Sequence, residues 1–417
     1  MMMLDAAGGP TTPRRAWEDL GTDRSLILDG AELWWVELPF VRPVATAVGT
    51  HRGRPLVLVR LRCRSVRDGT DVDGWGECAA LVDATYDAED VAGAFAGLEQ
   101  SILPSLGEAT ARDGGVLPST TGLGTLAGRV PGRPLSFAAL EMAVGDAHMR
   151  STGRSFASVL GVSGATVEPG AVLGVPGSTA ELLGAVERLA AAGYARVKVK
   201  VAPGTEFTTV STLAGWAARQ PGPTPRFQVD ANGSYTPHDA DLLVELDRFG
   251  LVCIEQPFHR DDLESHRRLA ARMSTPICLD ESLDGPPSVV DAVTSGACSV
   301  VCVKPARLGG LGAALEAIEW CTTTGVPWWI GGMFESGYAR RVTTALAALP
   351  GPTLPGDVAP PADYLAADLV GPLAGRVDAE TGRLAVPVSE VPGMGPVPDR
   401  AALEELLVRR VSVPLGR

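Results

Sequence analysis

The chain has 417 residues, 45% of them hydrophobic, and its formal net charge is −13 at pH 7. This length and composition supply enough apolar side chains for a large core and suit a globular protein of two domains. The acidic balance argues against nucleic acid or an anionic membrane as partner, because both bind basic surfaces. We therefore expect the partners to be small molecules.

Further features of the sequence favour a cytoplasmic protein. No apolar run reaches the roughly 18 residues of a membrane-spanning helix, and residues 1–23 lack the charged start and apolar core of a signal peptide. The seven cysteines are an odd number without a Cys-x-x-Cys pair, which indicates a reducing compartment rather than a disulfide framework. The sequence leaves the oligomeric state open, a homo-oligomer included.

The first part of the chain predicts a disordered arm and then an α+β domain. Residues 1–24 mix glycine, proline, threonine and charge without periodicity, as disordered segments do. Residues 25–165 are expected to form a capping domain. Its predicted elements are strands at 26–37, 56–63 and 74–81, helices at 87–106 and 136–150, and a long loop at 107–133.

Five short apolar segments in the middle of the chain each end in a residue that can bind a metal or carry a proton. They predict buried strands at 197–200, 227–230, 252–255, 277–280 and 301–304, which end in Lys200, Asp230, Glu255, Asp280 and Lys304. The three carboxylates follow one another at intervals of 25 residues, enough for one strand, one loop and one helix. This rhythm is typical of a (β/α) barrel.

We therefore predict an α/β fold, a modified TIM-type (β/α)7β barrel over residues 166–375 with the α+β capping domain in front of it. Residues 327–332 are expected as the seventh strand and 353–357 as a weaker eighth. Residues 376–417 follow the complete set of strands and are expected to return to the capping domain. The active site of such a barrel lies at the C-terminal ends of its strands.

The carboxylates at these strand ends predict a metal site. Asp230, Glu255 and Asp280 are hard oxygen donors with no histidine or cysteine at the matching positions, which suits Mg²⁺ better than Zn²⁺. A single carboxylate could simply cap a helix, but three beside lysines are costly to bury unless they are paired or bind a metal. A divalent ion there can stabilise the charge that forms when a substrate carboxylate loses its α-proton.

A lysine beside this metal is the candidate base. Lys200 can accept a proton only in its neutral form, so its pKa must be lowered by burial and by nearby positive charge. Lys198 and the metal would supply that charge.

Three cysteines alternate with the strand-end residues. Cys253, Cys278 and Cys302 each stand two positions before such a residue, so the strand period points them into the same barrel interior, one layer deeper. One interpretation is a thiolate metal site. The favoured one is that they are small apolar fillers, because free cysteine is among the most buried residue types.

Six motifs stand in a fixed order along the barrel. They are Lys198-Val199-Lys200, Asp230-Ala231-Asn232, Ile254-Glu255-Gln256-Pro257, Leu279-Asp280-Glu281-Ser282, Val303-Lys304-Pro305 with Gly309-Gly310, and Gly331-Gly332-Met333-Phe334-Glu335-Ser336-Gly337. In this order and spacing they resemble the enolase superfamily, and most of all its o-succinylbenzoate synthase and N-succinylamino acid racemase group. The likeness spans roughly residues 27–370.

The resemblance implies a role for each of these positions. The Mg²⁺ ligands would be Asp230, Glu255 and Asp280, with Mn²⁺ as an alternative ion, and Glu281 and Asn232 would support them. Lys200 would be the base, Lys198 its electrostatic partner, and Lys304 would face Lys200 across the substrate, in keeping with the lysine bases known for this superfamily. Expected substrate contacts are Gly331, Gly332, Met333, Glu335, Ser336 and, from the cap, Tyr86.

The implied function is a Mg²⁺-dependent lyase that removes a proton α to a carboxylate, in the dehydration to o-succinylbenzoate of menaquinone biosynthesis. The same residues would serve an N-acyl (N-succinyl) amino acid racemase, in which the two lysines exchange protons on opposite faces. A dipeptide epimerase is a weaker fit, because its Asp-x-Asp signature would stand where this chain has Gly331-Gly332-Met333. A silent carboxylate-binding barrel would not need both Lys200 and Lys304.

Overall fold

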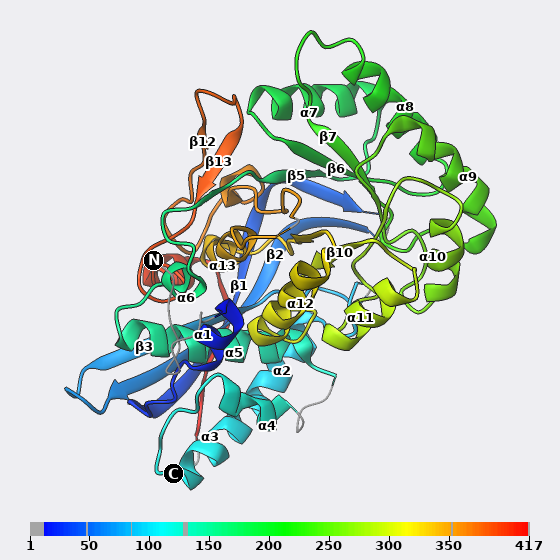
Figure 1. Cartoon of the computed structure of the whole chain (residues 1–417). Helices are drawn as coiled ribbons and strands as arrows, with labels where there is room; N and C mark the ends of the chain where they lie inside the picture. The colour runs from blue at the N-terminus through cyan, green and yellow to red at the C-terminus, as the bar shows by residue number, and fades with distance from the viewer. Residues whose placement is uncertain (1–11, 47–48, 85, 128–131, 352, 416–417) are drawn as a thin grey trace.

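The computed structural model describes residues 12–46, 49–84, 86–127, 132–351 and 353–415. A four-stranded antiparallel sheet lies beside a set of parallel strands surrounded by helices (Figure 1). Among the described residues, none of the helices is long and apolar enough to cross a membrane.

The antiparallel sheet takes strands from both ends of the chain, in the order β14-β1-β2-β3. The strands are β1 Leu26–Thr46, β2 Gly49–Ser65, β3 Asp71–Cys78 and β14 Leu407–Val413. A cluster of buried apolar side chains joins the sheet to α2 Val91–Gly97, the π-helical turn η1 Leu98–Ile102, α3 Leu103–Arg112 and α5 Pro134–Ser151. This is the predicted α+β cap.

Two glycines allow β3 to lie directly against α5. A Cβ atom on Gly74 would come within 2.2 Å of the Ala143 carbonyl oxygen, and one on Gly76 within 1.9 Å of that of Ala139. These distances leave no room for a side chain. The Gly-x-Gly pattern of β3 is therefore required for the packing of the helix on the sheet.

Seven parallel strands form the barrel sheet, in chain order from β5 to β11. They are β5 Gly170–Leu173, β6 Arg196–Lys200, β7 Arg226–Asp230, β8 Ile254–Glu255, β9 Ile277–Leu279, β10 Val300–Val303 and β11 Trp328–Ile330. The helices between and after them are α7 Thr179–Ala191, α8 Glu206–Ala217, α9 Ala240–Val244 with η4 Glu245–Phe249, α10 Leu263–Ala270, α11 Pro286–Thr294, α12 Leu311–Thr324 and α13 Gly337–Ala347.

The segment 353–357 closes the barrel without forming a regular strand. The Leu354 N–H donates to the Trp328 carbonyl at 3.0 Å on β11, and the Gly170 N–H of β5 donates to the Gly356 carbonyl at 2.6 Å. The predicted weak eighth strand is thus an irregular bridge between the first and seventh strands. The modified (β/α)7β barrel with its cap is confirmed.

The strands after the barrel join two different sheets. β12 Arg376–Val377 and β13 Leu384–Pro387 form a small sheet with β4 Thr166–Val167. Farther on, β14 pairs antiparallel with β1 in the cap. The return to the cap expected for residues 376–417 is therefore made by β14, whereas β12 and β13 pair elsewhere, and the predicted domain boundaries stay a proposal.

The expected disordered arm over residues 1–24 is wrong for residues 12–24. Helix α1 (Pro13–Glu18) starts after the cap residue Thr12, and Trp17 is only 1% exposed. The Trp17 Nε1–H donates to Glu141 Oε1 at 3.0 Å. A helix this short shows no periodicity, so its burial could not be read from the pattern. Residues 1–11 lie outside the described residues.

The expected long loop at 107–133 is also partly helical. Helix α3 continues to Arg112, and two short helices follow, η2 Thr121–Leu123 and α4 Gly124–Ala127. Residues 128–131 are outside the described part of the chain. The glycines and threonines that suggested a loop are used inside and between short helices.

Two buried carboxylates of the cap bind the barrel. Glu141 of α5 accepts from the Leu311 N–H at 2.5 Å and the Gly312 N–H at 3.0 Å, at the N-terminus of α12, where the helix dipole favours an anion. Gly310 has a φ of 126°, and a Cβ there would lie 2.0 Å from Glu141 Oε2. The glycine pair after Lys304 therefore makes room for the cap.

Glu77 of β3 makes the second connection. Its Oε1 accepts from the Ser336 N–H at 3.1 Å, and its Oε2 accepts from the Ser336 hydroxyl. Ser336 begins α13, which follows the last regular strand of the barrel. Cap and barrel are thus joined on two sides by hydrogen bonds that are shielded from water.

Replacing Trp17 with alanine should destabilise the protein, because the change empties a buried site and removes the bond to Glu141. Buried Trp→Ala changes cost about 3–5 kcal/mol of unfolding free energy. Urea denaturation followed by circular dichroism measures this. Arg15→Ala, on the exposed side of the same helix, is the matched control and should leave the transition nearly unchanged. Equal effects of the two changes would contradict the packing described for α1.

Glu77 should make stability depend on pH. Burial, helped by Glu335 and opposed by the hydrogen bonds from Ser336, raises the pKa of Glu77 from 4.5 to about 7. The folded chain then binds this proton more tightly than the unfolded chain, so the stabilisation is complete below pH 4.5 and is lost as the pH rises to about 7. The difference in unfolding free energy between wild type and Glu77→Gln should therefore fall across that interval. A flat or rising difference would show that the carboxyl stays ionised.

Candidate functional site

The six residues predicted for metal binding and proton transfer meet at the C-terminal ends of the barrel strands. Within the sheet, Lys200 of β6 is in register with Asp230 of β7, and Asp230 with Glu255 of β8. Asp280 and Lys304 directly follow β9 and β10. The strand pairing therefore brings these side chains to one level.

All three lysines of the chain lie at this site, at positions 198, 200 and 304. Every other residue in the Lys+Arg total is an arginine. The three lysine side chains are nearly inaccessible, with 3%, 8% and 6% of their surface exposed. An arginine stays charged under all ordinary conditions, whereas a lysine can give up and regain a proton. The chain thus has its exchangeable ammonium groups only here.

Lys198 lies deepest and holds two carboxylates together. Its Nζ is 3.0 Å from Glu255 Oε2 and 2.7 Å from Asp357 Oδ2. The ring of Trp329 lies beneath it, 4.6 Å from Nζ to the ring centroid. This cation–π contact and the two ion pairs offset part of the cost of burying the charge.

The other two lysines each pair with one carboxylate. Lys200 Nζ is 2.9 Å from Asp230 Oδ2, and Lys304 Nζ is 2.7 Å from Asp280 Oδ2. Lys200 also donates to Asn232 Oδ1. The two lysines therefore approach the site from β6 and from β10, four strands apart in the sheet.

Asn232 and Glu281 lie beside the carboxylates and are hydrogen-bonded to each other. The Asn232 amide donates to Glu281 Oε1 at 2.9 Å, and the Asn232 N–H donates to Asp230 Oδ1 at 3.0 Å. Asn232 and Gln256, which follow the strand ends, have φ angles of 45° and 38°. Such left-handed conformations of non-glycine residues cost energy and cluster at functional sites.

The pKa of Glu255 shows that the buried carboxylates repel one another. Burial, together with the nearby charge of Asp230, raises the pKa of Glu255 to about 8 against the opposing charge of Lys198. The charge of Asp280 raises it as well. A carboxyl that is held partly protonated by its neighbours would ionise fully if a divalent ion joined them.

Asp280 and Lys304 behave as a tight ion pair. Burial alone would raise the pKa of Asp280, but Lys304 and Arg307 hold it below its usual range. Burial likewise would lower the pKa of Lys304, but Asp280 outweighs it and holds the pKa above its ordinary value. Lys304 is thus a protonated, positively charged group beside the site.

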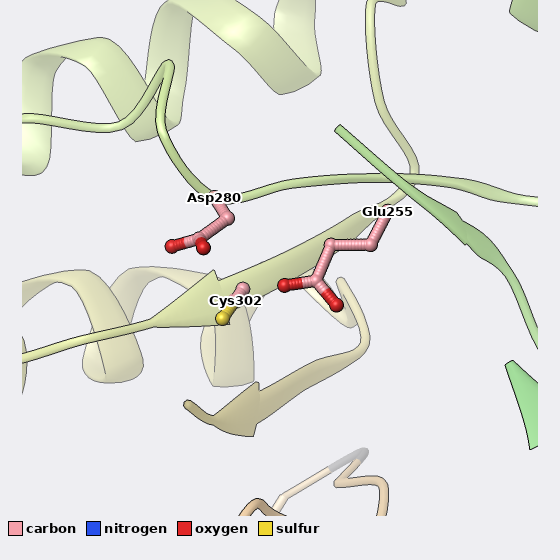
Figure 2. Close-up of side chains that lie close together, drawn as sticks. All are labelled: Glu255, Asp280 and Cys302. Atoms are coloured by element: carbon pink, nitrogen blue, oxygen red, sulfur yellow. The ribbon is translucent and has the colours of Figure 1, made fainter. Parts of the chain in front are cut away.

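The residues present fit a divalent cation. Glu255, Asp280 and Cys302 each offer a ligand atom within 4.8 Å of the others, and all three are buried (Figure 2). Asp280 Oδ1 is buried without a hydrogen-bond partner among the described residues. Asp230 is not part of this group of three, and its Oδ2 is paired with Lys200 at 2.9 Å. Two of the three predicted carboxylates therefore meet at ligand distance, and Asp230 is in register with Glu255 on the neighbouring strand.

A cavity of about 790 Å³ opens over these groups. Its floor includes Lys198, Lys200, Asp230, Asn232 and Lys304, and cap and barrel residues form its walls. Such a volume suits a small organic ligand.

Tyr86 reaches this cavity from the cap, and its expected contact with substrate stays a prediction. Its hydroxyl donates to Asp280 Oδ2 at 2.7 Å and accepts from Lys304 Nζ. The Arg307 guanidinium lies 4.1 Å from the centroid of its ring. Tyr86 of the cap therefore contacts Asp280 and Lys304 of the barrel directly.

The residues of the predicted substrate segment after β11 have different surroundings. Gly332 and Met333 line the cavity. Glu335 is paired with Arg340 at 2.7 Å, and Ser336 binds Glu77 of the cap. Gly331 lies against Cys302 and Lys304, where a Cβ would come within 2.5 Å of the sulfur. Ser336 is thus engaged with the cap, Glu335 is paired within the barrel, and the substrate contacts expected of both stay predictions.

Sequence reasoning missed three charged residues of the site. Asp357 binds Lys198, and its Oδ1 is 2.5 Å from the Arg196 guanidinium. Arg54 of β2 is buried and donates to the Met333 carbonyl at 2.9 Å. Asp357 could have been found, because it ends the predicted eighth strand as the other carboxylates end theirs. Arg196 and Arg54 carry no comparable signal.

The three cysteines lie beneath the carboxylates in one buried cluster with Trp329. Burial raises the pKa of Cys278 and of Cys302 well above the usual range of a thiol. Their packing in this cluster agrees with the interpretation as small apolar fillers.

Comparison with known proteins agrees with this geometry. Residues 181–402 match the family model described as enolase C-terminal domain-like. The chain is 36% identical over 384 residues to the N-succinylamino acid racemase of Amycolatopsis sp, which covers 92% of this chain and 98% of that protein. It is 34% identical over 370 residues to the o-succinylbenzoate synthase of Geobacillus stearothermophilus, covering 88% and 93%.

A solved structure gives the same result for the fold. The crystal structure of an enolase superfamily member from Listeria innocua superposes with a TM-score of 0.83 at 28% identity, covering 94% of this chain and 100% of that one. The cap, the barrel and the ordered site residues thus agree with the family match. The chain belongs to the enolase superfamily, in the group of o-succinylbenzoate synthases and N-succinylamino acid racemases.

Proposed function

We propose that this enzyme removes a proton α to a carboxylate and catalyses the dehydration that forms o-succinylbenzoate. The observation that carries the proposal is the confinement of all three lysines to one cavity, where each is paired with a carboxylate: Lys198 with Glu255, Lys200 with Asp230 and Lys304 with Asp280. Lysine is the cationic side chain that can exchange a proton, so its restriction to this cavity supports proton transfer. Curated relatives named o-succinylbenzoate synthase support the choice of reaction.

The cofactor of this proposal is Mg²⁺, with Mn²⁺ as an alternative. Asp230, Glu255 and Asp280 would hold it, with Asn232 and Glu281 orienting them. When bound, the ion would supply positive charge that stabilises the substrate carboxylate as its α-carbon loses a proton.

The chain's own groups then carry the proton. Lys200, in its neutral form, takes the α-proton and becomes an ammonium group. It returns this proton to the hydroxyl group that leaves from the same face, so that water departs and the lysine is neutral again. Lys304 keeps its charge throughout and stabilises the negative charge that develops between the two steps.

Racemisation of N-succinylamino acids is the second candidate. The approach of Lys200 and Lys304 from β6 and β10, at separate positions of the barrel sheet, favours it, because racemisation needs an acid and a base on opposite faces. The 36% identical relative from Amycolatopsis is named an N-succinylamino acid racemase. In this reaction Lys304 would have to lose its proton, which its ion pair with Asp280 opposes.

Further parts of the proposal concern the setting of the enzyme. We infer a small carboxylate as the partner, no binding of nucleic acid or membrane, a cytoplasmic location and an open choice between monomer and homo-oligomer. The net charge of −13 supports the second of these inferences.

Lys200→Ala should abolish turnover while the fold and Mg²⁺ binding persist. A positioned general base contributes about 10²–10⁴-fold to the rate, so kcat should fall by at least about 10²-fold. Circular dichroism and calorimetric titration with Mg²⁺ check the fold and the metal site. A variant that keeps a near wild-type rate would remove Lys200 from the role of base.

The test that separates the two reactions uses purified protein with Mg²⁺ in D₂O. The cyclohexadiene precursor of o-succinylbenzoate and a panel of N-succinylamino acids are offered in parallel. Loss of the precursor's absorbance with little α-deuteration supports the synthase, whereas rapid α-deuteration with inversion and slow dehydration supports the racemase. Inactivity on both kinds of substrate would contradict the proposal.

Lys304→Arg sharpens this test. Arginine keeps the positive charge but is a poor proton donor or acceptor. Dehydration should therefore survive the change far better than racemisation, measured on the same two substrates. Equal losses in both reactions would show that Lys304 does more than supply charge.

A further inference from the structure

Cys302 faces the metal carboxylates from the neighbouring strand. It lies on β10 beside β9, and its sulfur is within 4.8 Å of ligand oxygens of both Glu255 and Asp280. Figure 2 shows the Glu255 carboxylate and the Cys302 sulfur close together, with the Asp280 carboxylate above the sulfur. Two carboxylates and one thiol are therefore close enough together to bind the same metal ion.

An unused oxygen gives independent support for an ion at this point. Asp280 is 1% exposed, and its Oδ1 has no hydrogen-bond partner among the described residues. The Arg307 Nε lies 3.6 Å from this oxygen, too far for a hydrogen bond. A buried carboxylate oxygen without a donor costs free energy, so this atom is available to a metal.

The neighbouring thiols have other surroundings. Cys278 accepts a hydrogen bond from the Trp329 Nε1–H at 3.3 Å. Cys253 and Cys278 pack with Val252, Val300 and Trp329. Cys302 is the cysteine of this cluster that is grouped with the two carboxylates. The three thiols are therefore not equivalent, and the distinction can be tested by substitution.

We propose that Glu255, Asp280 and Cys302 bind a thiophilic divalent cation of the zinc class. Thiolate and carboxylate ligands suit such ions, whereas Mg²⁺ selects oxygen and does not use the sulfur. On binding, the Cys302 S–H bond breaks, a sulfur–metal bond forms, and the proton leaves to solvent. The site exists whichever of the two reactions the enzyme catalyses.

This site overlaps the proposed Mg²⁺ site, because both use Glu255 and Asp280. Mg²⁺ would complete its set with Asp230, and the thiophilic ion would complete its set with Cys302. The two ions therefore exclude each other. Zinc-class ions should compete with Mg²⁺ and displace it from the cavity.

Cadmium is the spectroscopic probe of this proposal, because a cadmium–thiolate bond absorbs in the near ultraviolet. One equivalent of Cd²⁺ added to the wild-type, metal-free protein should produce this band. The band should be lost in Cys302→Ser and kept in Cys278→Ser. Cys298→Ser, at a buried cysteine outside the cluster, is the matched control and should also keep it.

Three results would overturn the proposal. They are the absence of the band in the wild-type protein, its persistence in Cys302→Ser, and its loss in the Cys298→Ser control alone. Saturating Mg²⁺ should reduce the band, and a band that ignores Mg²⁺ would show that the sites do not overlap.

X-ray absorption at the zinc edge decides the question even if the serine variant fails to fold. The wild-type chain with one equivalent of Zn²⁺ should show one sulfur neighbour at about 2.3 Å together with oxygen neighbours. A first shell without sulfur would overturn the assignment of Cys302. Activity is not needed for either measurement, so a failure of the proposed reaction would be recognised separately.

Discussion

The pairing of buried lysines with buried carboxylates at the strand ends is the constraint on which the rest of the structure depends. Lys198 has 3% of its surface exposed, yet it binds Glu255 and Asp357 and rests on the ring of Trp329. A buried charge that loses its partner costs several kcal/mol. The strands must therefore keep their register to within one residue, since a slip would turn each charged side chain to the other face.

The cap depends on the same network through its contact with the cavity wall. Arg54 of β2 donates to the carbonyl of Met333 at 2.9 Å and to that of Ala80 at 2.7 Å. One cation thereby holds a barrel loop and a cap loop together beside the cavity. Glu77 and Glu141 bind the barrel at two further points. The wall of the cavity above the lysines is thus held by hydrogen bonds from both cap and barrel.

Much of the fold and site could be predicted because their signals are local. A short apolar run that ends in a charged residue identifies a barrel strand and the side chain at its end, and this rule placed Lys200, Asp230, Glu255, Asp280 and Lys304 at the strand ends, where the structure has them. The same rule would have found Asp357 if its strand had been regular. The contact of Ser336 with Glu77 could not be predicted, because the two residues lie 259 positions apart in the chain. Trp17 was missed for the same reason.

The confinement of lysine has a chemical consequence beyond catalysis. No lysine stands at the surface to react with acylating agents, aldehydes or sugars, because all three are at least nine-tenths buried beneath the cap. Reagents for ε-amino groups would therefore find their targets only where the cavity admits them. Covalent labelling of lysine ε-amino groups, which marks the surface of most proteins, would in this chain report the opening of the cavity.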